Sequence, residues 1–136
     1  MSVIKLGEHS YNIGALDVFS QLNIARRLTP VSPVIEGLTN PENEGKDFTI
    51  LVILMLGKLR DEDSDFVIRK CLQAVRINTN DQWFPIVNAQ GGLQYQHIGM
   101  KLMVDLATAV ILENLGDFFR TALSAPVEQA DQGKPV

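Results

Sequence analysis

The alternation of hydrophobic and polar residues at the N-terminus predicts a β-hairpin. β-Branched and aromatic residues at positions 3–6 and 11–13 flank a small polar turn at positions 7–10. A lone hairpin is marginally stable in water, so we expect it to pack on a helical body.

Residues 17–28 carry the pattern of an amphipathic helix. Asp17 is a favourable N-cap, and Thr29-Pro30 ends the helix because proline restricts the residue before it. The large apolar residues fall within one broad face of this helix: Val18, Phe19, Leu22, Ala25 and Leu28.

Two different patterns follow along the chain. Prolines and glycines punctuate residues 30–46, which predicts a long mobile loop with one turn of helix near residues 34–38. Residues 48–56 are apolar all round, which indicates a buried helix or a buried strand. The preceding Asp47, as a cap, and the length of the run favour the helix.

Acidic residues open a further helix, predicted from Asp61 to about Val75. The longest helix begins at Ile98 and is amphipathic. Its apolar side is formed by Leu102, Met103, Leu106, Val110, Ile111 and Phe118. Residues 124–136 lack an apolar pattern, so we expect a disordered C-terminal tail.

A second hairpin is predicted between residues 84–87 and 93–95, across the turn-forming residues 88–92. Pro85 indicates an edge position, because proline cannot donate a hydrogen bond to a strand ladder. The elements together predict an α+β, mostly α fold. A body of about four helices and one or two short β-hairpins forms a single domain over residues 1–123.

Composition and charge exclude several classes of function. The 136 residues suffice for one domain, and the net charge of -4 provides no basic face for nucleic acid or anionic lipid. The most apolar run, residues 48–56, is shorter than the ~20 residues that span a bilayer. Without a signal-peptide pattern, and with one cysteine, we expect a soluble cytoplasmic protein.

No pattern typical of catalysis or metal binding stands out. His9 and His97 have no partners at zinc-like spacing, and Cys71 lies on an apolar stripe, typical of a buried, inert thiol. The acidic residues 61–63 suit a helix N-terminus better than a calcium loop. We therefore predict no enzymatic activity, no metal and no cofactor. An enzyme with an unrecognised site has little support.

Aromatic residues concentrate in the second half of the chain. The consecutive Phe118 and Phe119 cannot both face one direction on a helix, so one of them is a candidate for contact with a partner. The candidate partner-binding residues are Trp83, Phe84, Leu115, Phe118 and Phe119. A binding groove is expected between the last helix and either the hairpin or the helix that begins at Asp61.

At these residues the chain resembles the phage tail assembly chaperones. The resemblance covers about residues 3–122 and rests on the N-terminal hairpin, the helix ending at Pro30, the acidic-capped helix, residues 83–87, and residues 114–119. The segment 30–46 departs from the family pattern. The resemblance implies a non-enzymatic chaperone that binds the tape-measure protein, helps recruit tail-tube subunits and is absent from the mature virion.

Two further expectations accompany this resemblance. The chaperone would act in the host cytoplasm, with possible self-association and without nucleic-acid or membrane partners. The alternative is a structural virion component, such as a tail-completion or head-tail joining protein, which would remain in the mature particle.

Overall fold

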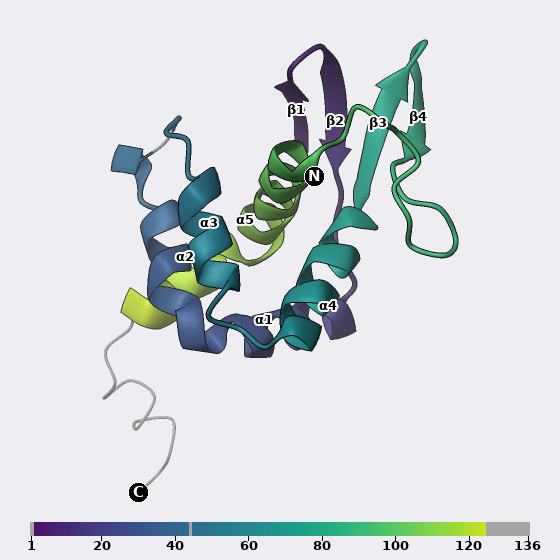
Figure 1. Ribbon diagram of the computed structural model, residues 1–136. Helices are drawn as coiled ribbons and strands as arrows, with labels where there is room; N and C mark the ends of the chain where they lie inside the picture. The colour runs from purple at the N-terminus through teal and green to yellow at the C-terminus, as the bar shows by residue number, and fades with distance from the viewer. Residues whose placement is uncertain (1, 44, 125–136) are drawn as a thin grey trace, which may run out of the picture.

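The chain folds into a four-stranded antiparallel sheet and a group of helices that extends away from it (Figure 1). This computed structural model describes residues 2–43 and 45–124. The strands lie in the order β1 (Ser2–Leu6), β2 (His9–Ile13), β3 (Val75–Thr79) and β4 (Gln82–Pro85). The helices are α1 (Val18–Leu28), α2 (Ser32–Leu38), α3 (Thr49–Leu56), α4 (Asp61–Leu72) and α5 (Met100–Ser124). The predicted α+β, mostly α fold class is confirmed.

One face of the sheet is apolar. Ile4, Tyr11, Ile77 and Phe84 lie opposite one another across the four strands. Residues paired in this way share one face of a sheet, and here Tyr11 and Ile77 are fully buried. β2 contacts α5, so this face joins the sheet to the longest helix.

The N-terminal hairpin is confirmed, but its turn is tighter than predicted. His9 and Ser10 pair with Leu6 and Lys5, which leaves Gly7-Glu8 as the turn. Gly7 adopts a φ of +66°, a conformation that a residue without a Cβ reaches at little cost.

The second hairpin lies elsewhere than predicted. β3 and β4 are joined at Asn80-Asp81, where both residues have positive φ (54° and 64°), as a type I′ turn requires. The predicted pairing of residues 84–87 with 93–95 is present only as an isolated antiparallel bridge from Val87 to Leu93, because residues 82–85 pair with β3. Pro85 does lie on the edge strand β4.

The helix that begins at Asp61 is shorter than predicted. It ends at Leu72, and Val75 opens β3 opposite Ile13. Just beyond this pair, the Gly14 N–H donates to the Ala74 carbonyl at 2.8 Å. A Cβ at Gly14 would lie 2.9 Å from that oxygen, so the close approach of the two chains requires glycine.

The predicted loop over residues 30–46 contains regular structure. Short 3₁₀ turns at Thr29–Val31 and Pro41–Asn43 flank α2, and α2 buries Ile35 and Leu38 and contacts α5. The helix is longer than the single turn expected there, because its apolar residues have a neighbour to pack against. The mobility of the segment stays a prediction.

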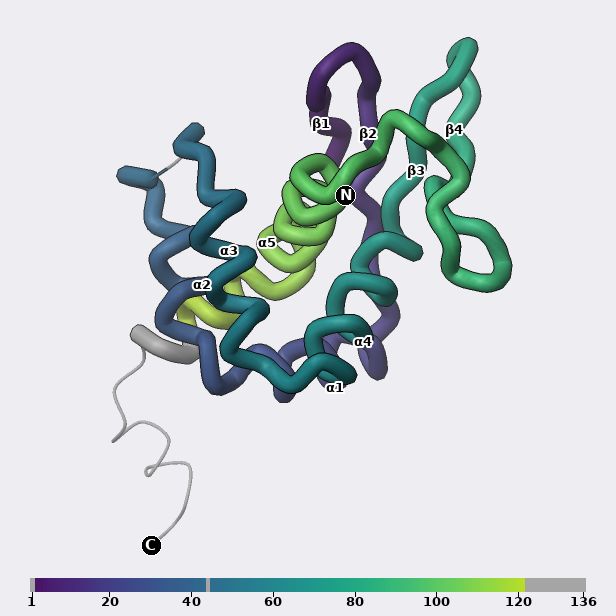
Figure 2. Tube along the Cα trace, in the orientation of Figure 1, coloured from purple at the N-terminus to yellow at the C-terminus, as the bar shows by residue number. Residues whose placement is uncertain are grey.

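α5 is the central element of the helical group. It contacts α1, α2, α3, α4 and β2, and Figure 2 shows it running from the sheet past α3 to α2. Its buried side comprises Val104, Leu106, Ala107, Val110, Ile111, Leu115 and Phe119. The predicted C-terminal tail lies outside the described residues, apart from Ser124, which ends α5.

Candidate protein-binding surface

α1 turns most of its predicted apolar face outward. Leu22 is 61% exposed, and Val18 and Phe19 are more exposed still, whereas Ile24 and Leu28 form the buried side. The usual interpretation of an amphipathic helix, that its apolar face meets the core, is therefore wrong for α1.

The polar side of α1 packs inward because α4 accommodates it. The Arg27 guanidinium lies 4.0 Å from the centre of the Phe66 ring, a cation–π contact. Arg27 Nε also donates to Asp63 Oδ1 at 3.1 Å. These contacts bring a charged residue against α4, so Val18 and Leu22 are left facing away from the core.

The exposed residues of α1 meet the C-terminal half of α5 in a shallow depression of about 250 Å³. Phe118 on α5 is 55% exposed there, and Leu115 is buried beneath it. We define the α1–α5 surface by its lining residues: Val18, Gln21, Leu22, Ala25, Asn114, Leu115 and Phe118. The lining carries no charged side chain, so it suits an apolar ligand surface.

Asn114 fixes α5 to the segment that leads into α1. Its Oδ1 accepts from the Leu16 N–H at 2.8 Å, and its Nδ2 donates to the Gly14 carbonyl at 3.1 Å. Nδ2 also donates to the Val110 carbonyl within α5. One side chain thus sets the position of the chain that enters α1.

The structure places the predicted partner-binding residues in three different settings. Leu115 and Phe118 belong to the α1–α5 surface, but Phe119 is only 4% exposed and lies in the core. Trp83 and Phe84 lie on β4, in a different part of the molecule (Figure 1). Their role in binding stays a prediction.

Sequence reasoning placed Val18 and Leu22 on the apolar side of α1 but did not identify them as exposed. A signal was present: Val18, Leu22 and Ala25 form one helical stripe, while Ile24 and Leu28 form a second. A helix with two apolar stripes has more apolar surface than a single contact with the core can cover.

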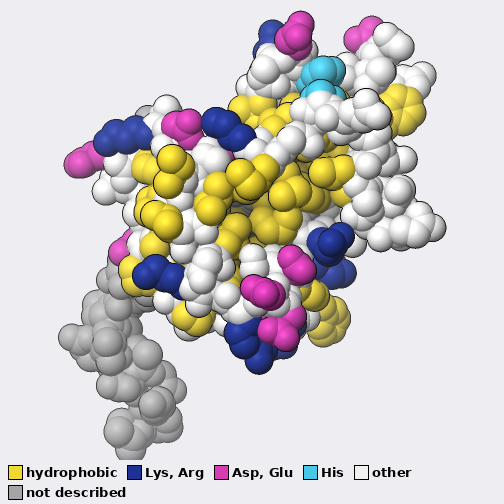
Figure 3. Space-filling model, in the orientation of Figure 1, with side chains coloured by type: hydrophobic (Ala, Val, Ile, Leu, Met, Phe, Trp, Pro, Cys, Tyr) yellow, Lys and Arg dark blue, Asp and Glu magenta, His cyan; other side chains and the backbone are white. Residues whose placement is uncertain are grey.

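A second apolar surface lies on α3. We define the α3 surface by Ile50, Leu51 and Leu54, all of which are exposed. The prediction that residues 48–56 are buried all round is therefore wrong for this side, since α5 covers the opposite side, at Val52 and Met55. Figure 3 shows hydrophobic side chains over α3 and across the middle of the same face.

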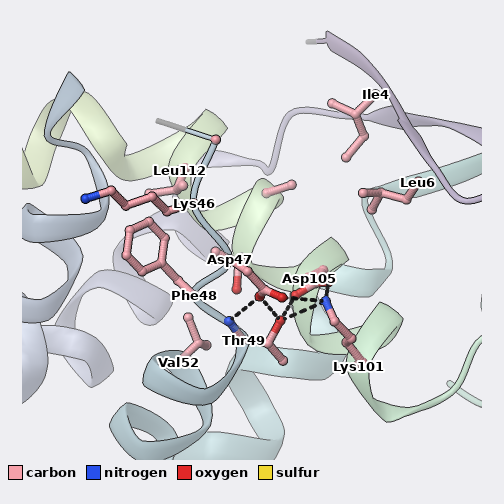
Figure 4. Close-up of a pocket in the computed structure, with 13 residues that line it drawn as sticks. Ile4, Leu6, Lys46, Asp47, Phe48, Thr49, Val52, Lys101, Asp105 and Leu112 are labelled. Carbon is pink, nitrogen blue, oxygen red and sulfur yellow. Dashed lines mark hydrogen bonds and ion pairs between the residues drawn. The ribbon is translucent and has the colours of Figure 1, made fainter. Parts of the chain in front are cut away.

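A polar network holds the start of α3 against α5 (Figure 4). Thr49 Oγ1 lies 2.7 Å from a carboxylate oxygen of both Asp47 and Asp105, and it accepts from Lys101 Nζ at 3.1 Å. The Thr49 N–H and hydroxyl, followed by Lys101, lower the pKa of Asp47. Asp47 caps the helix from one residue earlier than a standard N-cap.

The same network borders a groove of about 510 Å³ between β1, α3 and α5. Its apolar walls include Ile4, Leu6, Phe48 and Leu112 (Figure 4). A groove between the last helix and the hairpin is therefore present, as expected. Its part in binding stays a prediction.

The two histidines and the cysteine make structural contacts. His9 and His97 stack with ring centres 4.3 Å apart, and His97 Nε2 shares a hydrogen bond with the Tyr11 hydroxyl. Burial, and next the charge of His9, lower the pKa of His97. Burial raises the pKa of Cys71 to about 12. Within residues 2–43 and 45–124, no three metal-binding side chains cluster.

The sequence matches the family model of phage tail assembly chaperone proteins over residues 7–126. The chain belongs to this family. No curated protein and no solved structure matches it. Tail assembly chaperones are not known as enzymes, and their partners in tail assembly are proteins. In the part of the chaperone that the structure describes, no helix has the length and hydrophobicity needed to cross a membrane.

Proposed function

We propose that this chaperone binds the tape-measure protein in the host cytoplasm, through the α1–α5 surface, and helps recruit tail-tube subunits to it. The observation that carries the proposal is the exposed, uncharged depression between α1 and α5, on a chain that belongs to the tail assembly chaperones. The chaperone then leaves before the tail matures, without binding nucleic acid or membrane.

The shape of the surface suits an apolar stripe on a helix. Leu22 and Phe118 are exposed residues of its lining, one from each helix, and Leu115 is a buried one. A helix that presents apolar residues at positions i and i+3 or i+4 would fill such a depression. Burial of an exposed leucine or phenylalanine contributes about 1.5–3 kcal/mol, so one site binds weakly.

Weak single sites suit a long partner. Several chaperones on one rod, joined by contacts between themselves or with tail-tube subunits, would hold it far more tightly than any one site does. Release during tail maturation then requires only that these linked contacts be lost one after another.

The decisive experiment is co-expression with the tape-measure protein, followed by co-purification of the soluble complex. We expect Phe118→Asp and Leu22→Asp to remain folded and to lose the partner, because each places a charge in the apolar depression. Leu54→Asp is the matched control, since Leu54 and Leu22 are both 61% exposed on helices. Retention of the tape-measure protein by both depression variants would rule out this surface.

Polar replacement of Leu115 and Phe119 is the test that the sequence alone suggests. The structure makes it uninformative, because both side chains are 4% exposed and belong to the core. Such a variant loses the partner by unfolding, whether or not these residues touch it. For this reason the test variant changes Phe118 and leaves Phe119 intact.

Two further measurements test the remaining parts of the proposal. Added tail-tube protein is expected to co-sediment with the purified complex and not with the tape-measure protein alone. Mass spectrometry of purified particles is expected to detect the tape-measure protein and no chaperone. Stoichiometric amounts of this chain in mature particles would instead identify a structural virion component.

A further inference from the structure

The two edges of the four-stranded sheet differ. β1 and β4 are the outer strands, so each pairs with a neighbour on one side only. On β4, Pro85 has no N–H, and its carbonyl accepts from Gln94 Nε2 at 3.1 Å. A proline and a covering loop are two of the means by which sheets protect an edge from further pairing. β1 contains no proline, and it borders the groove of about 510 Å³.

The pairing of β1 with β2 shows which backbone groups of β1 face its edge. Leu6 and His9 flank the two-residue turn, so they exchange both of their backbone hydrogen bonds. Such pairs recur at every second residue of an antiparallel ladder, so Ile4 also bonds β2 through its backbone. The N–H and carbonyl groups of Val3 and Lys5 therefore point away from β2, where a further strand can pair with them.

The side chains of β1 alternate in the same way. Val3 and Lys5 are exposed on the outer face of the sheet, whereas Ile4 and Leu6 are partly buried and line the groove. A strand that pairs with this edge alternates likewise, so every second side chain of that strand lies on the groove side.

The rest of the groove comes from α5 and from the chain that leads into α3. α5 contributes Ala109 and Leu112, and residues 45–49 contribute the wall that includes Phe48. Figure 4 shows Ile4 and Leu6 of β1 on one side and Phe48 on the other. The groove is thus bounded by chain on both sides.

This second wall limits what can pair with β1. A single extended segment lies about 4.8 Å from the strand it pairs with, and it would enter between β1 and residues 45–49. A second folded copy would instead bring its own helices against that wall. A helix bonds its backbone groups internally, so it would leave those of Val3 and Lys5 unpaired.

We propose that the edge of β1 and the groove beside it form a docking site for an extended segment of a partner protein, which pairs antiparallel with β1 as a fifth strand. Antiparallel pairing continues the arrangement of the four strands. On the groove side the segment carries apolar residues at alternate positions, which meet Ile4, Phe48 and Leu112. On the outer face it carries an acidic residue across from Lys5, since opposite charges on paired strands attract.

Docking at β1 goes beyond the proposed binding of the tape-measure protein and does not depend on it. The groove beside β1 and the α1–α5 surface share no lining residue. A segment paired with β1 therefore leaves Leu22 and Phe118 uncovered. A partner held at both places would be bound more tightly than at either place alone.

Titration of the isotopically labelled chain with a synthetic peptide, followed by NMR, tests the site. The probe has valine at its even positions, threonine at its odd positions and glutamate in place of the central threonine. Over about 10 μM to about 5 mM peptide, a range that suits a small contact, the amide signals of Val3 and Lys5 are expected to shift and saturate. The signal of Trp83, on the β4 edge, should not move. Absence of a saturable shift at Val3 and Lys5 would overturn the proposal.

Two variants test the backbone pairing and the groove separately. Val3→Pro removes an N–H that faces the edge and keeps the bonds to β2, whereas Ala109→Phe fills the groove and leaves the strand unchanged. Each should weaken peptide binding by about tenfold or more. Trp83→Pro is the matched control, because it removes the equivalent N–H at the β4 edge, and it should bind the peptide normally. Circular dichroism confirms folding, and normal binding by a folded Ala109→Phe would contradict the proposal.

The charge of Lys5 tests the arrangement of the paired strands. A peptide with lysine in place of its central glutamate should bind about threefold more weakly, and Lys5→Glu should reverse this order. An unchanged order in Lys5→Glu would contradict the pairing across from Lys5. Shifts of the Val3 and Lys5 signals that appear when the chain is concentrated without peptide would assign the edge to a second copy and overturn docking of a partner segment.

Discussion

α1 and α3 both expose leucine to the same extent, yet they present it in different settings. On α1, Leu22 stands beside Phe118 of another helix, and the two border a depression without charged side chains. On α3, Leu54 stands with Ile50 and Leu51 on the exposed side of a single helix.

The difference indicates two kinds of partner. A depression formed by two helices accepts a protruding apolar stripe, and its lack of charge sets no direction for the incoming chain. A single exposed apolar stripe on one helix instead needs a partner with a concave apolar surface. Exposed apolar area alone does not separate these cases, whereas the surrounding residues do.

The largest effect on stability is expected at Phe119, and the adjacent Phe118 on α5 is its comparison. Phe119→Ala should lower the free energy of unfolding by about 3–5 kcal/mol, because it leaves a cavity in the core. Phe118→Ala, whose side chain is half exposed, should lower it far less and weaken partner binding instead. Urea denaturation of both variants measures the contrast. Equal losses of stability would place Phe118 in the core and remove it from the α1–α5 surface.

A smaller loss of stability is expected from Asn114→Ala, which affects the α1–α5 surface. The variant leaves the Leu16 N–H without its acceptor, at a cost of about 1–3 kcal/mol. Partner capture should fall at temperatures where the fold holds. Asn23→Ala is the control, since Asn23 bonds the Phe19 carbonyl within α1. Unchanged partner capture would show that the position set by Asn114 does not matter for the α1–α5 surface.

Thr49→Val tests α3, the second helix of the comparison. The variant removes the hydroxyl between Asp47 and Asp105 and should cost about 1 kcal/mol. Partner capture should persist, because Thr49 is not among the residues that line the α1–α5 surface. Thr108→Val is the matched control, since the Thr108 hydroxyl bonds the Val104 carbonyl of its own helix. Loss of partner capture by a folded Thr49→Val would show that the position of α3 affects the α1–α5 surface.

Local patterns predicted much of this fold because they depend on neighbouring residues. The hairpin turn at Gly7, the cap at Asp17 and the edge position of Pro85 each follow from the chemistry of one residue. The sequence reasoning missed the hairpin at Asn80-Asp81, where a type I′ turn attaches β4 to β3 and leaves only Val87 of residues 84–87 to pair with Leu93.

The exposed surfaces were harder to predict because burial depends on distant contacts. Arg27 is polar in the sequence, but Phe66 and Asp63 on α4 draw it inward and turn Leu22 outward. Residues 48–56 have no polar side, so the sequence does not show which side α5 covers. The predicted residue Phe118 is exposed and its neighbour Phe119 is not, which periodicity alone left open.

The smallest expected effect is a pH dependence that leaves both surfaces unchanged. The pKa of His97 lies below its ordinary value of 6.5 in the fold, so unfolding makes this side chain easier to protonate. Its contribution to stability is therefore complete above pH 6.5 and decreases as the pH falls through and below that value. The denaturant midpoint should fall slightly from about pH 7.5 to about pH 5.5, and less in His97→Gln. The α1–α5 surface carries no titratable side chain, so partner capture should stay constant over this range. A change in partner capture within this range would show that protonation near β2 reaches the α1–α5 surface.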